Sequence, residues 1–228
     1  MRVASRHPFP HPSIRRLPLY LRFLKQLRDA GSQKISCTRI ARELDLDSTQ
    51  VRKDLALTGI VGRPRIGYVL TDLVQAIEKF LGWDQRALAF LAGVGNLGRA
   101  IIGYEDFRRC GLDIVAAFDI DAGKIGGEVF GRRVYHPAEM PALTPKLGVS
   151  VGVITVPAVA AQEVADVMVK SGISGIWNFS PIRLELPPRV RVENALLTSS
   201  LAVLSVDLKR ESPEAAPPFQ RPPARRSR

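Results

Sequence analysis

A glycine-rich turn with binding chemistry of its own lies near the middle of the chain. The run Gly93-Val94-Gly95-Asn96-Leu97-Gly98 follows the apolar segment 87–92 and opens a segment of helical character. The first glycine of such a run allows a tight turn, the second lets a pyrophosphate approach the backbone, and the third lets helix and strand pack closely. The helix N-terminus then offers amide N–H groups to phosphates. The motif predicts a site for a dinucleotide or a closely related nucleotide, with a purely structural turn as the alternative.

A carboxylate follows at the distance that such a site requires. Asp119 stands 21 residues after Gly98, at the end of the next apolar segment, where it can accept hydrogen bonds from both ribose hydroxyls of NAD(H). No arginine directly follows it, which favours NAD(H) over NADP(H) as the cofactor. Thr155-Val156-Pro157 and Asn178-Phe179-Ser180-Pro181 also end predicted strands. They are candidates to line the crevice, although ordinary turn chemistry explains them equally well.

Positive charge is concentrated at one end of the chain. The net charge is +11, and residues 1–68 carry 14 Lys and Arg against 5 Asp and Glu. Residues 69–208 carry 13 against 15, and residues 209–228 carry 6 against 2. A basic block of domain size indicates a polyanionic partner, because phosphate contacts and counterion release dominate nucleic-acid affinity. A merely soluble basic surface is the alternative.

The basic block has the helical pattern of a winged helix-turn-helix domain. Apolar residues recur at helical spacing over residues 13–30, with Ser13 as the expected cap, and a short helix follows Ser36. Asp47 and Gln50 match a capping box that opens a third helix. Two short strands turning through residues 62–67 and a fourth helix over 71–81 complete the expected unit.

The third helix is the candidate recognition helix, because its polar and cationic outer face suits the major groove. The turn stiffened by Pro64 suits a wing that reaches phosphates or a minor groove. A three-helix unit with a solvated charged face is the alternative, but the charge balance favours double-stranded DNA. The candidate DNA-binding residues are Ser48, Thr49, Gln50, Arg52 and Lys53 on this helix, Arg63 and Arg65 on the wing, and Arg15 and Arg16 on the first helix.

The rest of the chain alternates between apolar strands and helices. Strands are predicted over 87–92, 114–118, 149–154 and 173–177, with the clearest helix over 158–170. This alternation predicts an α/β fold with a Rossmann-type, doubly wound parallel sheet. The expected organisation is a flexible arm (1–12), the winged helix (13–82), the Rossmann domain (83–194), a C-terminal helix (195–210) and a disordered Pro- and Arg-rich tail (211–228).

Composition sets the expected compartment. No apolar run approaches the length of a membrane span, and the N-terminus lacks the apolar stretch of a signal peptide. The two cysteines, Cys37 and Cys110, are too few for a disulfide framework or for a zinc site of their own. We expect a cytoplasmic protein with reduced cysteines and neither a metal site nor a membrane partner.

Together these motifs resemble the redox-sensing repressors called Rex, over about residues 13–208. The resemblance implies a homodimer in which the C-terminal helices swap between subunits. It also implies tight binding to inverted-repeat operator DNA with NAD⁺ or no ligand, and release when NADH closes the dimer. The residues that carry the resemblance are 14–20 (IRRLPLY), 47–55 (DSTQVRKDL), Gly67-Tyr68, the turn Gly93–Gly98, 116–119 (AAFD), Thr155-Val156-Pro157 with Ala161-Gln162, and Asn178-Phe179.

The sequence also departs from that family. Ala56-Leu57-Thr58-Gly59 replaces the usual Ser-Tyr-Phe-Gly, and the wing carries Arg63-Pro64-Arg65-Ile66 before Gly67. In the family an arginine of the first helix, a tyrosine after the glycine turn and a later aspartate form a ligand-sensitive cluster. These switch positions hold Arg22, Tyr104 and Leu196 here. We therefore expect NADH to bind but to shift DNA affinity less than in relatives that carry the aspartate, unless Leu196 simply packs in the dimer core.

A dehydrogenase is the main rival from another class of protein. Hydride transfer needs an acid–base group beside the nicotinamide, but the only histidines are His7, His11 and His136, and no Tyr-x-x-x-Lys pair lies near the cleft. We predict no catalytic residues and no enzymatic activity. A third hypothesis keeps the DNA-binding regulator and changes the ligand to another adenine nucleotide, such as coenzyme A.

Overall fold

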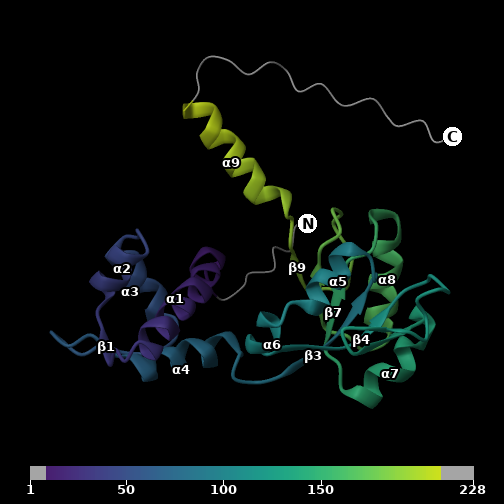
Figure 1. The fold of residues 1–228 in the computed structure, drawn as a ribbon, viewed down its shortest axis with the longest axis horizontal. Helices are drawn as coiled ribbons and strands as arrows, with labels where there is room; N and C mark the ends of the chain where they lie inside the picture. The colour runs from purple at the N-terminus through teal and green to yellow at the C-terminus, as the bar shows by residue number, and fades with distance from the viewer. Residues whose placement is uncertain (1–8, 212–228) are drawn as a thin grey trace.

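The first four helices of the computed structural model, which describes residues 9–211, gather at one end of the molecule (Figure 1). A two-stranded antiparallel sheet pairs Lys34 with Val69 and Ile35 with Tyr68 beside them. These elements are α1 (His11–Asp29), β1 (Lys34–Ile35), α2 (Cys37–Glu43), α3 (Ser48–Ala56), β2 (Tyr68–Val69) and α4 (Leu70–Leu81).

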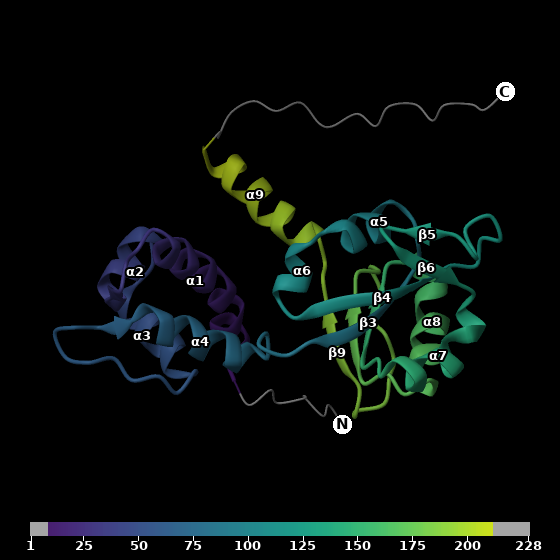
Figure 2. The ribbon, with the colours of Figure 1, turned by 60° about the horizontal axis from the view of Figure 1, so that its bottom comes forward.

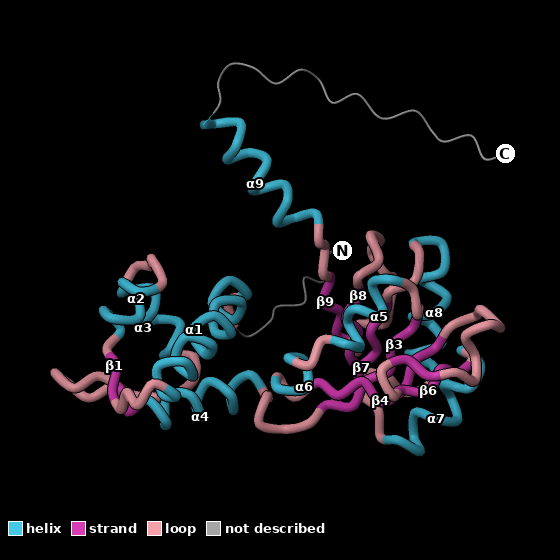
Figure 3. The backbone as a smooth tube through the Cα atoms, in the orientation of Figure 1, coloured by secondary structure: helices cyan, strands magenta, loops and turns pink. Residues whose placement is uncertain are grey.

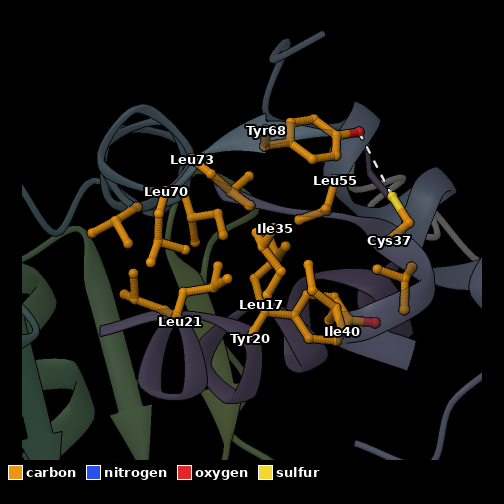
Figure 4. Close-up of a cluster of buried hydrophobic side chains, with 14 of the residues drawn as sticks. Leu17, Tyr20, Leu21, Ile35, Cys37, Ile40, Leu55, Tyr68, Leu70 and Leu73 are labelled. Carbon is orange, nitrogen blue, oxygen red and sulfur yellow. Dashed lines mark hydrogen bonds between the residues drawn. The ribbon is translucent and has the colours of Figure 1, made fainter. Parts of the chain in front are cut away.

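One apolar core holds this helical unit together (Figure 4). Leu17 and Leu24 lie two helical turns apart on α1, so both point into the core, and each is fully buried. Ile40 from α2, Leu55 from α3 and Ile77 from α4 are also fully buried. Burying one such side chain stabilises the fold by about 1.5–3 kcal/mol, so these contacts fix how α3 lies on α1.

Two local predictions for this unit are wrong in detail. Helix α1 begins at His11 with Pro10 as its N-cap, so Ser13 is not the cap and residues 11–12 are helical rather than part of an arm. Pro12 lies in the first turn of α1, where a proline is well tolerated because the N–H that it lacks would have no partner within the helix. The N-cap half of the capping-box prediction for α3 is confirmed, because Asp47 Oδ1 accepts a hydrogen bond from the backbone N–H of Gln50 at 2.9 Å. The reciprocal half is not formed, since the Gln50 amide faces Arg16.

The wing is a single tight turn rather than a two-stranded hairpin. The backbone groups of Arg63 and Gly67 bond to each other at 2.8 and 2.9 Å, and only β2 continues as a strand. Arg65 adopts a left-handed φ of 61° and Gly67 one of 80°, which closes the loop within a few residues. Strand β2 pairs with β1 instead of with a second wing strand.

A seven-stranded sheet forms the other end of the molecule, in the order β5-β6-β4-β3-β7-β8-β9. Every neighbouring pair is parallel except β5 with β6. The parallel strands therefore follow the order 3-2-1-4-5-6 of the Rossmann fold, with the reversal between β3 and β7. The strands are β3 (Ala87–Ala92), β4 (Leu112–Phe118), β5 (Glu128–Val129), β6 (Arg132–Tyr135), β7 (Val151–Ile154), β8 (Gly175–Asn178) and β9 (Arg191–Asn194).

Helices cover both faces of this sheet (Figure 2). Alternate side chains of β3 point to opposite faces, so Leu91 packs toward α5 and α6 while Phe90 packs toward α7 and α8. The covering helices are α5 (Asn96–Gly103), α6 (Asp106–Arg109), α7 (Met140–Leu147) and α8 (Ala158–Lys170), with a short 3-10 turn η1 (Pro137–Glu139) before α7. The doubly wound sheet that the alternation predicted is confirmed; strand β9, whose residues are mostly exposed, was not predicted.

The last helix, α9 (Thr198–Glu211), follows β9 closely and extends away from both folded parts (Figures 1 and 3). It begins three residues after the predicted start of the C-terminal segment. Leu197, Leu201, Leu204 and Leu208 recur at helical spacing along this segment, and each is more than half exposed. The predicted tail beyond residue 211 and the first eight residues of the predicted arm lie outside the described residues. Across residues 9–211 there is no helix of the length and apolarity that a membrane crossing requires.

Candidate nucleotide site and nucleic-acid interface

The glycine turn leaves one face of its backbone open. Gly93 has a left-handed φ of 99°, and a Cβ there would lie 2.9 Å from the backbone of Thr155. A Cβ on Gly98 would collide with the carbonyl oxygen of Gly93, so helix and strand could not pack as they do. A Cβ on Gly95, by contrast, would meet nothing within 4 Å. The close contacts at Gly93 and Gly98 shape the turn, and the open side at Gly95 gives a pyrophosphate direct access to backbone.

The same turn forms one wall of a cavity of about 440 Å³. Helix α5 begins here with Gly95 as its N-cap and no side chain capping it, so its first amide groups remain available to an anion. Val94 and Asn96 line the cavity from the turn, while Lys124 and Glu128 line it from the segment after β4. The size and the donors fit the phosphate and ribose portion of a dinucleotide.

Asp119 directly follows β4 and bonds to two residues that line this cavity, Val94 and Lys124. Its Oδ2 accepts from the Val94 N–H at 2.8 Å and from Lys124 Nζ at 3.1 Å, and its Oδ1 accepts from the Asp121 N–H at 3.0 Å. Burial alone would raise the pKa of this carboxyl, but these donors outweigh burial and lower the pKa from its ordinary value. The group is therefore a held, ionised acceptor suited to ribose hydroxyls.

Lys124 is a site residue that the sequence prediction missed. It lies five residues after Asp119, forms an ion pair with it, and lines the same cavity. The Asp119–Lys124 spacing carries no motif by itself, because the loop between them has to fold back before the two groups meet. A cation therefore lies beside Asp119 even though no arginine directly follows it in the sequence.

Thr155, which directly follows β7, supports the glycine turn. Thr155 Oγ1 donates to the carbonyl oxygens of Ala92 at 2.9 Å and Gly93 at 2.8 Å. Val156 packs partly buried against one apolar layer of the sheet, and Pro157 is the exposed N-cap of α8. Leu97, in the first turn of α5, packs against the other layer.

Asn178 was predicted to bind the cofactor, but its side chain is fully buried. Its Nδ2 donates to Asn194 Oδ1 and to the Ile182 carbonyl at 2.9 Å each, and its Oδ1 accepts from the Ser180 N–H. With every polar atom engaged, Asn178 joins β8 to β9, and its contact with the cofactor stays a prediction. The hydroxyl Oγ of the neighbouring Ser180 is buried with no hydrogen-bond partner.

On the helical unit, most candidate DNA-binding side chains face solvent. Thr49, Arg52 and Lys53 are exposed on α3, and Arg63 and Arg65 are exposed on the wing. Ser48 and Gln50 are half-buried at the edge of the same α3 face. This cationic surface has the composition that phosphate and base contacts require.

Arg15 makes a contact between the two parts of the molecule. Its Nη2 lies 2.8 Å from Glu193 Oε1 on β9, and the two side chains are 69% and 52% exposed. So exposed an ion pair contributes only about 0–1 kcal/mol. Arg15 can therefore exchange Glu193 for a DNA phosphate at small cost.

Arg16 is placed differently from its prediction as a DNA contact. Its Nε and Nη2 donate to the two carboxylate oxygens of Asp54 at 2.7 and 2.8 Å, and Asp54 is only 1% exposed. Tyr20 Oη donates to the same carboxylate at 2.7 Å. Burial would raise the pKa of Asp54, but hydrogen bonds from Arg16, Ser13 and Tyr20 lower it overall. The guanidinium is thus committed to α3 of its own chain.

The three switch positions stay separate in this chain. Tyr104 is 53% exposed and packs its ring on Phe107, Leu196 is 53% exposed just before α9, and Arg22 is exposed on α1. Within the described part of the chain, no hydrogen bond or ion pair joins any two of them. Their role remains a prediction.

An enzyme would need an acid–base group beside the nucleotide, and the side chain of His136 is engaged in a turn instead. His136 Nδ1 accepts from the Ala138 N–H at 3.2 Å while Glu139 accepts from the His136 N–H at 3.0 Å, so His136 caps a 3-10 turn. Among residues 9–211, no group of three or more His, Cys, Asp or Glu could hold a metal ion.

A basic helix-turn-helix joined to a Rossmann sheet with an open glycine turn defines a class of protein: a nucleotide-responsive DNA-binding regulator. Family models agree with both halves, since one described as "Putative DNA-binding protein N-terminus" matches residues 9–56 and one described as "CoA binding domain" matches residues 84–182. The chain belongs to the Rex family of redox-sensing transcriptional repressors.

Curated relatives carry that name at high similarity. The Redox-sensing transcriptional repressor Rex of Treponema denticola is 46% identical over 86% of this chain and 93% of its own length. That of Pelotomaculum thermopropionicum is 42% identical over 90% of this chain and 97% of its own. Both are named as repressors, not as enzymes.

Solved structures extend the similarity to the whole fold. A structure of RSP in complex with β-NAD⁺ and operator DNA has a TM-score of 0.83 at 32% identity, covering 89% of this chain and 94% of that one. A structure of RSP in complex with β-NADH has a TM-score of 0.81 at 31% identity, covering 90% and 97%. RSP itself is described as a Rex-family repressor.

Proposed function

We propose that the protein is a dimeric repressor that binds inverted-repeat operator DNA, and that its affinity for this DNA falls when NADH occupies the Rossmann crevice. The observation that carries the proposal is that one chain contains both an exposed cationic recognition helix and an open glycine turn beside the Asp119 carboxylate, which hydrogen bonds fix in place. RSP, which matches this chain over both parts, has been solved with operator DNA and with both oxidation states of the nicotinamide.

The residues present fit the cofactor. Backbone amides at Gly95 and the start of α5 would hold the pyrophosphate, and Asp119 would accept from ribose hydroxyls. NADH and NAD⁺ differ by a hydride and by the positive charge of the nicotinamide ring, so they can stabilise two arrangements of the protein unequally. A nucleotide can change the affinity for DNA only if it binds one of the two arrangements more tightly than the other.

The C-terminal helix α9 suits packing against a second copy of the chain. Its leucine row, Leu197 to Leu208, is largely exposed and lies on a helix that extends from the body of the protein. A two-fold dimer would bury this row and present two α3 helices to successive major grooves, which is why the site should be an inverted repeat. A repressor with these ligands acts on chromosomal DNA in the cytoplasm.

A second candidate changes only the ligand. The match to a model described as a CoA binding domain over residues 84–182 favours coenzyme A. Arg99 and Lys124 both line the cavity and could hold an additional phosphate. In this alternative the DNA-binding function is the same.

Selection of duplexes from a random pool by the full chain, repeated with NADH, NAD⁺, NADP(H) or coenzyme A, tests the proposal. We expect inverted repeats bound by dimers, with NADH giving the largest loss of affinity. Monomers bound to asymmetric sites would refute the dimer, and a response to coenzyme A alone would replace NADH. Turnover of NADH by the protein with candidate substrates would identify an enzyme.

A further inference from the structure

The guanidinium of Arg16 reaches the edge of the DNA-facing surface as well as the buried carboxylate. Nε and Nη2 hold Asp54, and Nη2 also lies 3.4 Å from Ser13 Oγ. The remaining nitrogen, Nη1, points to Gln50 on the first turn of α3. Arg16 is therefore the side chain that links the interior of the helical unit to a candidate base-reading residue.

The contact fixes which end of the Gln50 amide faces Arg16. With its carbonyl oxygen toward the guanidinium, Gln50 accepts from Arg16 Nη1 at 3.1 Å and also lies 2.8 Å from Nε, whose single N–H it shares with Asp54. The reverse orientation would set the NH₂ group of Gln50 against the N–H groups of Arg16, donor against donor. The amide NH₂ group is consequently the end that is left for a ligand.

We infer that Arg16 is a positioning residue that sets the base preference of the recognition helix by holding the Gln50 carbonyl oxygen. A free glutamine reads adenine with both ends of its amide, accepting from N6 and donating to N7. A glutamine whose oxygen is already engaged can only donate. Gln50 should then prefer an edge with acceptors alone, such as O6 and N7 of guanine or O4 of thymine, over the mixed edge of adenine.

The surroundings of Arg16 explain why it stays in place. Asp54 is almost fully buried, and a buried carboxylate left without its partner is costly. The two-pronged contact with Asp54 and the hydrogen bond from Tyr20 hold the pair across α1 and α3. Release of Arg16 toward a DNA phosphate would break this contact, so Arg16 acts through Gln50 and not by touching DNA.

This inference rests on the proposed DNA binding, and its test separates the two. The probes are an inverted-repeat duplex that the native chain selects from a random pool and copies altered at one base pair at a time. Gln50→Ala first identifies the base pair that Gln50 reads. Arg16→Lys keeps the charge but loses the planar fork, and Arg28→Lys, in the last turn of the same helix and paired with Asp29, is the matched control.

We expect Arg16→Lys to lower discrimination at the Gln50 base pair by about tenfold, the order of one good base contact, and to leave the salt dependence unchanged. Arg28→Lys should leave discrimination intact. Adding Arg16→Lys to Gln50→Ala should cost no further discrimination, because both changes remove the same contact. Additive losses, or a uniform loss at every base pair with a smaller salt slope, would overturn the inference.

Gln50→Glu keeps the test decisive if Arg16→Lys does not fold. The new carboxylate would pair with Arg16 but has no NH₂ group, so the preference should move from an acceptor edge to a donor edge such as N4 of cytosine. An unchanged base preference in Gln50→Glu would refute the inferred role of Arg16 and Gln50 and would leave the proposed function standing. Failure of the native chain to select any DNA sequence would instead refute the proposed function.

Discussion

Replacement of Asp119 tests the nucleotide site most directly. Its carboxylate holds the Val94 and Asp121 N–H groups and Lys124 before any nucleotide binds. Asp119→Ala removes both the ribose acceptor and the support of the glycine turn. Asp119→Asn keeps a carbonyl oxygen for the Val94 N–H but loses the charge and one acceptor. The pair of variants therefore separates recognition of the ribose from the shape of the turn.

The expected magnitude follows from the hydrogen bonds that each variant removes. A hydrogen bond to a charged group contributes about 1.5–3 kcal/mol, and about 1.4 kcal/mol is a factor of ten in affinity. Asp119→Asn should weaken NADH binding by roughly 10-fold to 100-fold. Asp119→Ala should weaken it further, because the Val94 amide also loses its acceptor and the turn is less well held.

Calorimetric titration with NADH and NAD⁺ measures both variants, with operator affinity measured in the absence of nucleotide. Asp121→Asn is the matched control, since Asp121 meets Asp119 through its backbone N–H and its side chain is largely exposed. DNA binding without nucleotide should be unchanged in all three variants. An unaltered NADH affinity in Asp119→Ala would refute the ribose role.

Three further outcomes are expected. Arg63→Ala or Arg65→Ala on the exposed wing should weaken binding to all DNA sites and lower the salt slope by about one unit; equal slopes in salt titrations would place the wing in solvent. Leu196→Asp should enlarge the loss of DNA affinity on NADH binding by about 1–3 kcal/mol, the usual size of such coupling, through a charge-assisted bond to Arg22. A native protein that already releases DNA fully, and that this change does not improve, would show that the switch runs elsewhere. The pKa of Asp54 is lowered by folding, so the stability that its carboxylate contributes is present above about pH 3.9 and is lost as pH falls through the folded value. The free energy of unfolding of Asp54→Asn, measured in urea, should therefore depend less on pH in the acid range than that of the native protein. An identical pH dependence would contradict this.

Features that depend on neighbours in the sequence could be predicted from the sequence alone. The glycine turn followed its strand and opened its helix, because each glycine is required by a contact within a few residues or by the next strand of a regular sheet. Asp47 capped α3 because a cap joins groups only three residues apart. The alternation of apolar strands and helices likewise predicted a doubly wound sheet.

The tertiary structure decided which polar side chains are free. Arg16 and Asp54 are 38 residues apart, and Asn178 and Asn194 are 16 apart, so no local pattern indicated that these side chains pair with each other. Arg16 looked like a phosphate contact and Asn178 like a cofactor contact because their types suit those tasks. Each is instead engaged with its own chain, since packing α1 on α3 and β8 beside β9 buries a polar group that must then be satisfied inside the protein.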